Sequence, residues 1–515
     1  MSEKRRIVVN TLANGVAQFA ALIASFVFMP FLIRSFGTTG FGLYLLASSV
    51  VAYGILLDLG VGASVVKMTA DAAARGHRED LSSVISSALV FYLLIGIAVA
   101  AIMTALALNA ASIFHTDPSD SLLLRNLFLV AGAVSLWTWP LSVAGHVLNG
   151  FQKFTQKAYV STAAILATIA VTAIVVVLHQ GPLVLMIGNA AVGLVSSLVQ
   201  LLLARRALGD VRVSVTQANV SGLRSVFSFA WAVFVIQVCT VIVYQQTDRL
   251  VLGIFVGAAT ITLYEAAGKF QGLVAQLTTF TVSAVMPLAS QLEAEGRQDT
   301  LRSLFLRGTK YSLALVNPVV IVLVVVARPL LQSWLGATFA AQALAAQLLI
   351  SHQLLTSGVA VGDAMIVGLG QLGRRVPYAL AMALLNLTIS LALVQRFGIL
   401  GVVLGTTIPY LIDLPFHMRL ILKVLDVPLS RWLRETILPT YPLLLIPLAV
   451  SLVLLRTPLS ASLLGIAAIG ILSVSLYWMA VVTWGFNREE RDELRAAMNG
   501  ALARLLASRT TGNPT

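Results

Sequence analysis

The stretch Gly37-Thr38-Thr39-Gly40-Phe41-Gly42-Leu43-Tyr44 has a counterpart 220 residues later, Gly257-Ala258-Ala259-Thr260-Ile261-Thr262-Leu263-Tyr264. The two stretches share their first glycine and their last tyrosine. The same offset recurs at further identical pairs: Gly76 and Gly296, Leu81 and Leu301, Ser83 and Ser303, and Gly181 and Gly401. A constant offset over this length predicts an internal repeat. Two like-oriented helix bundles around a central cavity are typical of alternating-access transporters, and a passive membrane scaffold is the alternative.

The composition predicts an all-α polytopic membrane protein with about 14 transmembrane helices. Of its 515 residues, 58% are hydrophobic and only 11% are charged, which is more apolar surface than a soluble domain needs. The expected membrane spans are residues 9–33, 42–66, 84–108, 123–148, 159–178, 183–204, 226–248, 259–286, 308–328, 341–369, 376–395, 400–422, 437–455 and 461–484.

The distribution of basic residues predicts the orientation. An even number of spans places both termini on one side, and that side with its loops carries 27 of the 34 lysines and arginines. Because cytoplasmic loops are enriched in Lys and Arg, both termini are expected in the cytoplasm. The formal charge of +13 is therefore read as a topology signal, and no nucleic-acid partner is expected. Cys239, the single cysteine, excludes an intrachain disulfide and a cysteine metal site.

The expected organisation has two halves, two further helices and a tail. Residues 1–204 form the first six-helix half, 205–225 a cytoplasmic linker, and 226–424 the second six-helix half. Residues 425–486 supply two extra transmembrane helices, and 487–515 form a cytoplasmic amphipathic tail. Asn487 followed three residues later by Glu490 is the pattern of a capping box at the start of that tail helix.

Ionisable side chains inside the expected spans need an explanation, because one at mid-bilayer costs ~2.5–3.5 kcal/mol on insertion scales. Glu265 and Lys269 are four residues apart and share a helical face. They form either a local ion pair or an arrangement in which Lys269 contacts an anion and Glu265 tunes it. Further ionisable groups in or at the ends of spans are Asp58, His146, Asp248, Arg249, Asp363 and Asp413.

Polar stripes mark the first helix of each half. Asn10, Asn14 and Gln18 recur at helical spacing in the first span, and Gln237, Gln245 and Gln246 lie in the seventh. Such stripes either join helices or line a hydrated cavity, and their presence in both lead helices favours the cavity. The sequence has no phosphate-binding loop, metal-ligand cluster or Ser/His/Asp set, so neither an enzyme nor a cofactor or metal is expected. Transport would then draw on an ion or substrate gradient.

Four short motifs carry a family resemblance. They are Phe41-Gly42-Leu43-Tyr44, Leu57-Asp58-Leu59-Gly60-Val61-Gly62, Asp248-Arg249-Leu250-Val251-Leu252-Gly253 and Tyr264-Glu265-Ala266-Ala267-Gly268-Lys269. These residues resemble the polysaccharide-transporter family of lipid-linked oligosaccharide flippases. That family belongs to the multidrug/oligosaccharidyl-lipid/polysaccharide exporter superfamily. The resemblance covers essentially the whole chain.

The resemblance implies a function and candidate sites. A member of this family moves an undecaprenyl-diphosphate-linked oligosaccharide repeat from the cytoplasmic to the periplasmic leaflet of the bacterial inner membrane. It does so by alternating access, for O-antigen or exopolysaccharide synthesis. The expected partners are that lipid-linked oligosaccharide, membrane lipids, and polysaccharide polymerase and chain-length proteins. The candidate substrate contacts are Arg34, Arg249, Lys269, Asn14, Gln18 and Gln245. The candidates for ion coupling are Asp58, Asp248, Glu265 and Asp363.

Three other functions stay open. A cation-coupled multidrug antiporter of the same superfamily would favour an acidic, aromatic-lined cavity, whereas this chain also keeps basic groups within its spans. A membrane glycosyltransferase or polymerase would need long periplasmic loops with acidic or arginine side chains. The best such loop, 109–122, offers only Asp117 and Asp120, which disfavours this class. A scaffold of polysaccharide assembly is the third alternative.

Overall fold

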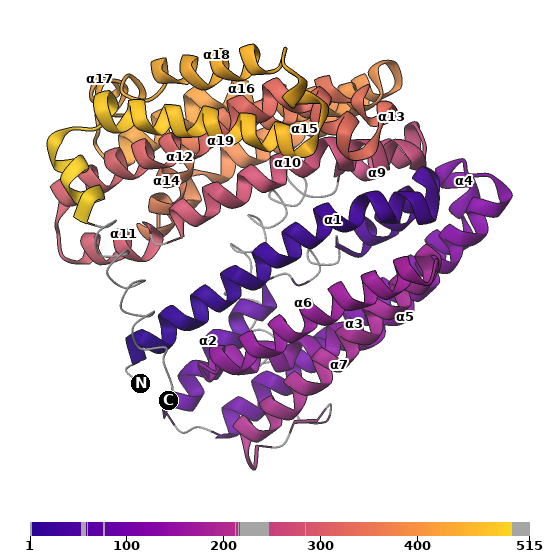
Figure 1. The fold of residues 1–515 in the computed structure, drawn as a ribbon. Coiled ribbons are helices and arrows are strands. Elements are labelled where there is room, and N and C mark those ends of the chain that lie inside the picture. The colour runs from indigo at the N-terminus through magenta and orange to yellow at the C-terminus, as the bar shows by residue number, and fades with distance from the viewer. Residues whose placement is uncertain are drawn as a thin grey trace, which may run out of the picture. The chain divides into compact units, whose positions relative to one another are not determined.

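The computed structural model describes residues 3–52, 58, 60–75, 78–211, 213–214, 216, 247–283 and 285–496; the side chains of residues 3–19, 52, 74 and 78–80 lie outside the description. In these ranges all regular secondary structure is helical (Figure 1). Twelve helical stretches there are long and apolar enough to cross a membrane. The predicted all-α polytopic fold is confirmed. The expected spans 42–66 and 226–248 run through residues outside the description, so the count of fourteen stays a prediction.

The helices pack into two compact units. Unit 1 comprises Met1–Ala266 and Gly373–Pro409, and unit 2 comprises Ala267–Leu372 and Tyr410–Thr515. The expected division into two six-helix halves with two extra helices and a tail stays a prediction. Unit 1 contains α1 (Glu3–Ala52), α2 (Val61–Arg75), α3 (Arg78–Leu108), α4 (Ala110–Phe114), α5 (Pro118–Gly150), α6 (Phe154–Val177), α7 (Pro182–Leu208), α9 (Thr247–Phe255) and α15 (Val376–Phe397).

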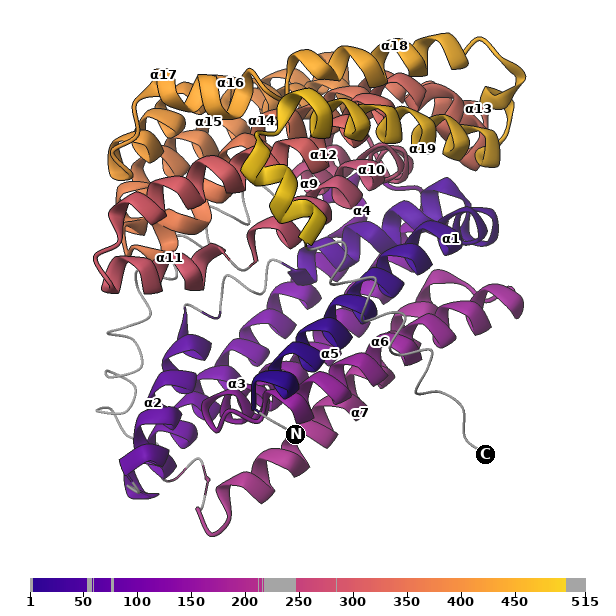
Figure 2. The same cartoon turned by 60° about the vertical axis from the view of Figure 1, so that its left-hand side comes forward.

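Unit 2 is built around the long helix α12, against which α14 and α19 pack (Figure 2). Its helices are α11 (Val285–Ala294), α12 (Gln298–Leu335), α13 (Ala337–Ala340), α14 (Ala343–Gly368), α17 (Leu429–Trp432), α18 (Leu445–Leu454) and α19 (Leu463–Ala480). Short 3₁₀ and π segments join them: η3 (Leu372–Arg374), η4 (Leu433–Ile437), η5 (Pro442–Leu444), η6 (Pro458–Ala461) and η7 (Val481–Gly485). Two helices cross the boundary between the units: α10 (Ala258–Val282) and α16 (Ile399–Val424).

The repeated glycines occupy equivalent turns. Gly37 has a φ of 73° and interrupts the helical geometry within α1, and Gly257 has a φ of 118° between α9 and α10. Glycine adopts positive φ without the steric penalty of a Cβ atom. The pair at the start of the sequence repeat therefore marks the same structural event, a change of chain direction after a helix.

The two repeated stretches also touch each other within unit 1. Thr262 Oγ1 donates a hydrogen bond to the carbonyl of Thr38 at 2.7 Å, and a Cβ atom on Gly42 would lie 1.9 Å from the carbonyl oxygen of Ala258. Ala258 follows Thr38 by 220 residues, and Thr262 follows Gly42 by the same number. The two contacts are therefore reciprocal: Thr38 of the first stretch meets Thr262 of the second, and Gly42 meets Ala258. Such reciprocity is expected of a local two-fold contact.

After η7 the described residues 488–496 are helical and pack on the rest of unit 2. The Asn487 amide donates to Glu490 Oε2 and the Glu490 amide donates to Asn487 Oδ1, both at 2.8 Å, which is the capping box that the sequence predicts. Leu494 packs on a cluster that includes Ala314 and Tyr477. We call the ion pairs between this helix and α12 the tail contact; it consists of Arg307, Lys310, Glu489, Glu490 and Glu493.

Candidate functional site

Two motifs of the second repeat meet where α9 is followed by α10. Tyr264 Oη donates a hydrogen bond to Asp248 Oδ2, and Arg249 Nη2 lies 2.5 Å from Glu265 Oε2. The side chains of Arg249 and Glu265 are 21% and 13% exposed. Two carboxylates, an arginine and a tyrosine from two separate motifs are therefore held in one half-buried set.

The local fold explains this pairing. The structure describes nine residues of α9, Thr247–Phe255, and the turn at Gly257 brings the start of α10 back alongside them. Consecutive residues of a helix project ~100° apart, so Asp248 and Arg249 meet two consecutive partners, Tyr264 and Glu265. Because each pair joins neighbouring helices, the set fixes their relative position as well as the charges.

Two further helices add oxygen atoms to this set. Asp248 forms a side-chain hydrogen bond with Thr406 of α16, and Asn386 Nδ2 of α15 donates to Thr406 Oγ1 at 3.1 Å. Asn386 Oδ1 and Ser390 Oγ, one helical turn apart, are buried, and neither has a hydrogen-bond partner among the described residues. We call Asp248, Arg249, Tyr264, Glu265, Asn386, Ser390 and Thr406 the Asp248 cluster.

The chemistry of the Asp248 cluster suits a hard cation. Carboxylate, amide and hydroxyl oxygens are the ligands that such ions prefer, and a buried acceptor without a partner costs about 1–3 kcal/mol. A cation bound between Asp248, Asn386, Ser390 and Thr406 would satisfy these acceptors. Among the described residues, no group of three or more His, Cys, Asp or Glu side chains could hold a metal ion.

A second polar set lies elsewhere in unit 1, on α2, α3 and α5. Asp58 accepts hydrogen bonds from Tyr92 Oη and from the Gly62 amide, the latter at 3.3 Å. Tyr92 Oη lies 3.4 Å from His146 Nε2, and the two rings stack with centroids 5.9 Å apart. A Cβ atom on Gly62 would lie 2.4 Å from the His146 ring. The glycine is thus what lets α2 approach α5 closely enough for Asp58 to join this set.

A third set lies in unit 2, where His417 of α16 stands between two carboxylates. His417 Nε2 lies 2.5 Å from Asp363 Oδ1, and His417 Nδ1 lies 3.7 Å from Asp413 Oδ2. The histidine side chain is 2% exposed and Asp363 is 43% exposed. We call these three residues the His417 cluster; it joins α14 to α16 and presents one carboxylate to the surroundings.

Some of the predicted site residues lie in these three sets, and others lie outside them. Glu265 forms an ion pair with Arg249, and Lys269 is half-buried one turn further along α10. The local pair of Glu265 with Lys269 and the anion contact of Lys269 both stay predictions. Arg34 is exposed on α1. Asn14 and Gln18 belong to the part of α1 whose side chains are not described, and Gln245 lies outside the described residues.

Sequence reasoning missed several partners of the predicted residues. Tyr92, Asn386, Ser390, Thr406 and His417 all lie in apolar stretches whose periodicity does not single them out. The available signal was indirect: each carboxylate in a membrane span needs a partner. That rule predicts the existence of a partner and leaves its position in the sequence open.

Comparison with known proteins assigns the family. The chain matches the family described as polysaccharide biosynthesis protein over residues 7–293, more than half of its length. The chain belongs to this family. The matched region contains the Asp58 set and the α9–α10 half of the Asp248 cluster. The family membership predicted from the sequence motifs is confirmed.

One curated relative is similar to part of this chain. The chain is 20% identical over 210 residues to the probable low-salt glycan biosynthesis flippase Agl15 of Haloferax volcanii. That match covers 41% of this chain and 44% of the relative, so it spans less than half of the relative's length.

Two structures share the fold over most of the chain. The lipid II flippase MurJ in an inward closed conformation matches with a TM-score of 0.66 and 16% identity, covering 90% of this chain and 98% of that one. A multidrug resistance MATE family transporter in an inward-facing conformation matches with a TM-score of 0.61 and 14% identity, covering 80% and 99%. At these identities the matches show the fold, which a lipid flippase and a multidrug transporter share.

Proposed function

We propose that this protein is a flippase that moves an undecaprenyl-diphosphate-linked oligosaccharide repeat from the cytoplasmic to the periplasmic leaflet of a bacterial inner membrane. Its product would enter O-antigen or exopolysaccharide synthesis, with polymerase and chain-length proteins as downstream partners. The observation that carries the proposal is the family match over residues 7–293. The flippase names of Agl15 and MurJ support it. The relatives named here are flippases and transporters, which supports a transport protein rather than an enzyme.

Alternating access supplies the mechanism. Multidrug resistance MATE family transporters that share this fold have been solved in an inward-facing and an outward-facing conformation, with TM-scores to this chain of 0.61 and 0.53. Two states of one fold let a binding site open to each leaflet in turn. In our proposal both termini face the cytoplasm, and the glycan and diphosphate pass through the protein while the polyprenyl tail stays in lipid.

The diphosphate must be held by cations, because its charge is costly to bring into a low-dielectric environment. Arg249, Lys269 and Arg34 are the proposed contacts, with Asn14, Gln18 and Gln245 for the glycan. Arg249 has five donors in a planar fork, so it can hold a phosphate oxygen while one donor stays on Glu265. Loss of charge on Glu265 would release more of that fork to the substrate.

Ion coupling would act on the same group of residues. Asp248 precedes Arg249 in the chain, so a proton or cation bound at Asp248 changes the charge directly beside the proposed phosphate contact. Two ligands whose sites interact in this way alter each other's affinity by the same factor. Asp58 and Asp363 are further coupling candidates, each hydrogen-bonded within its own set.

The proposal is tested by reconstituted flipping. Purified protein in liposomes is given a fluorescent polyprenyl-diphosphate oligosaccharide, and the labelled lipid in the outer leaflet is followed with a membrane-impermeant quencher. Loss of a hydrogen bond to a charged group costs about 1.5–3 kcal/mol, so Arg249→Ala with Lys269→Ala should slow flipping by about 100-fold. Arg125→Ala removes an exposed cation on α5 and serves as the matched control. Unchanged flipping by the double variant would refute the anion site.

The same liposomes test the coupling and the rival function. Flipping should fall when proton and sodium gradients are both collapsed, and unaltered flipping would remove the coupling proposal. The fold match to a multidrug transporter makes a cation-coupled drug antiporter the second candidate. Exchange of an organic cation for protons or sodium, without flipping of the diphosphate lipid, would favour that candidate.

A further inference from the structure

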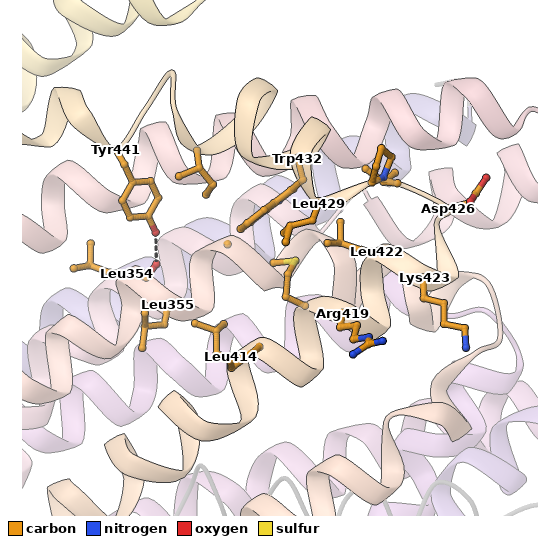
Figure 3. A pocket seen from close by; sticks show the side chains of 16 residues that line it. Leu354, Leu355, Leu414, Arg419, Leu422, Lys423, Asp426, Leu429, Trp432 and Tyr441 are labelled. Carbon is orange, nitrogen blue, oxygen red and sulfur yellow. Dashed lines mark hydrogen bonds between the residues drawn. The ribbon is translucent and has the colours of Figure 1, made fainter.

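A cavity of about 1020 Å³ lies in unit 2 beside the C-terminal part of α16 (Figure 3). Its walls come from α14, α16, α17 and the segment that follows α17. Most of the lining is apolar, and the lining side chains used below are Leu354, Leu414, Met418, Leu422, Trp432 and Tyr441. A cavity of this size is at the upper end of the range that holds one small ligand.

One end of this cavity is basic. Arg419, Lys423 and Asp426 line it there, and all three are exposed. Asp426 is paired from outside the cavity: its Oδ2 lies 2.5 Å from Arg302 Nη2 of α12, an arginine that also lies 3.2 Å from Asp299. Within the described part of the chain, Arg419 and Lys423 form no ion pair. They are four residues apart on α16, hence on one helical face, and they leave two positive charges at the mouth.

The other end of the cavity carries no charged residue among the described residues that line it. Tyr441 Oη donates a hydrogen bond to the carbonyl of Leu354 at 2.9 Å, and this bond lies at the opposite end of the row of lining residues from Lys423 and Asp426 (Figure 3). Met418 and Leu422 between them are buried. The cavity is therefore an apolar compartment with a cationic end.

We propose that this cavity binds one anionic glycerophospholipid of the cytoplasmic leaflet. Its phosphate lies against Arg419 and Lys423, and its acyl chains lie along the apolar walls toward Tyr441. Basic pockets between transmembrane helices on the cytoplasmic side are favoured sites for anionic head groups, and the segment 417–436 belongs to the side that the basic residues mark as cytoplasmic. The cavity volume of about 1020 Å³ favours the two acyl chains of a glycerophospholipid over an undecaprenyl chain, which has more carbon atoms than both acyl chains together.

The bound lipid has a structural consequence in unit 2. It contacts α14 and α16 on one side and Trp432 on the other, at the start of the span Leu429–Leu454. A bound lipid would cover the apolar side chains of the cavity wall, which would otherwise face solvent or detergent. It would also connect α14 and α16 with the segment that contains Trp432. The lipid should therefore stabilise the folded protein in detergent, by the mass-action effect of any ligand that binds only the native state.

Native mass spectrometry and thermal unfolding test this directly. The full-length protein is purified in mild detergent and titrated with phosphatidylglycerol or, separately, with phosphatidylcholine of the same chains. A basic residue near an anionic surface contributes ~1 kcal/mol, so Arg419→Ala with Lys423→Ala should weaken phosphatidylglycerol binding by about 25-fold. Leu414→Trp should reduce binding of both lipids by filling the cavity. Arg456→Ala, which removes an exposed cation of the same unit, is the matched control and should bind as the wild type does.

The outcomes separate the possible occupants. Selective loss of phosphatidylglycerol in the double variant, with the loss of both lipids in Leu414→Trp, supports the proposal. Equal retention of phosphatidylglycerol by wild type and double variant overturns it, as does equal stabilisation by the two lipids. Copurification of a polyprenyl diphosphate that the double variant loses would also overturn it, by showing that the transported lipid is the occupant. None of these measurements involves flipping, so the result is independent of the proposed transport function.

Discussion

The Asp248 cluster and the tail contact both contain ion pairs, and they differ in how fully their buried oxygen atoms are hydrogen-bonded. In the tail contact, Lys310 Nζ lies 2.7 Å from Glu490 Oε2 with side chains only 7% and 3% exposed, and Arg307 contacts both Glu489 and Glu493. Every carboxylate there accepts from a cation. In the Asp248 cluster, two buried oxygens, Asn386 Oδ1 and Ser390 Oγ, have no hydrogen-bond partner within the part of the chain that the structure describes.

This difference predicts a structural role for the tail contact and a binding role for the Asp248 cluster. Burial of charge alone marks both regions, so burial does not identify function. Acceptors left without donors beside a carboxylate indicate room for a positively charged ligand. We therefore expect changes in the tail contact to alter stability and changes in the Asp248 cluster to alter transport.

The largest expected effect is on stability, in the tail contact. Lys310→Met leaves Glu490 buried without its cation, and breaking a buried pair in this way costs about 3–5 kcal/mol. The double variant Lys310→Met with Glu490→Gln should recover much of this, because glutamine keeps the capping box and no buried charge remains. Thermal unfolding in detergent measures both variants.

The control for this prediction is an exposed pair of the same unit. Arg297→Ala removes the partner of Glu295, with side chains 57% and 39% exposed, and should change stability by less than about 1 kcal/mol. Flipping per folded molecule should stay near the wild-type rate in all three variants. A Lys310→Met protein as stable as the wild type would show that the tail helix does not hold unit 2.

The second effect is on transport, in the Asp248 cluster. Asp248→Asn keeps an acceptor for Tyr264 Oη and removes the negative charge. If this charge couples an ion to the substrate, gradient-driven flipping should fall by about 100-fold, within the range of typical coupling energies. The measurement is flipping with and without an imposed sodium or proton gradient. Asp299→Asn, whose side chain is 98% exposed, is the control, and an equal loss in both variants would contradict a specific role.

The sequence predicted the membrane class and the capping box of the tail, because the first depends on composition and the second on residues close together in the chain. It placed Asp248, Arg249, Tyr264 and Glu265 among the motifs, and the structure brings them together. The sequence did not predict the ion pair that Glu265 forms with Arg249, which crosses from α10 to α9. Helical periodicity identifies neighbours on one helix, whereas Arg249 reaches Glu265 through the turn at Gly257.

The same limit explains the partners that sequence reasoning missed. Tyr92 lies 34 residues from Asp58, His417 lies 54 residues from Asp363, and Asn386 lies 20 residues from Thr406. Each pair depends on which helices pack together, and close approach at Gly62 or Gly405 decides that packing. The sequence indicates that an ionisable residue in a membrane span needs a partner, and tertiary packing determines which residue becomes that partner.

A third, intermediate effect tests the contact between the two repeated stretches, which adjoins the Asp248 cluster through α10. Gly42→Ala would place a Cβ atom 1.9 Å from the Ala258 carbonyl oxygen, and such overpacking costs about 1–3 kcal/mol. Gly193→Ala is the matched control, because a Cβ atom there meets nothing within 4 Å and alanine favours a helix over glycine. Thermal unfolding should therefore move in opposite directions for the two variants. A Gly42→Ala protein that unfolds at the wild-type temperature would show that this contact bears little of the packing.

The smallest effect is expected in the His417 cluster, which combines features of the two regions compared above. Like the tail contact it is an acid–base pair, and like the Asp248 cluster it lies within expected spans. Asp363 is 43% exposed, so water can replace part of what its charge supplies, and Asp413 still faces His417 Nδ1 at 3.7 Å. Asp363→Asn should therefore reduce gradient-driven flipping by no more than about fivefold, equivalent to ~1 kcal/mol. If this variant instead loses as much transport as Asp248→Asn, ion coupling does not depend on unpartnered buried oxygens, and an exposed carboxylate beside a histidine is sufficient for it.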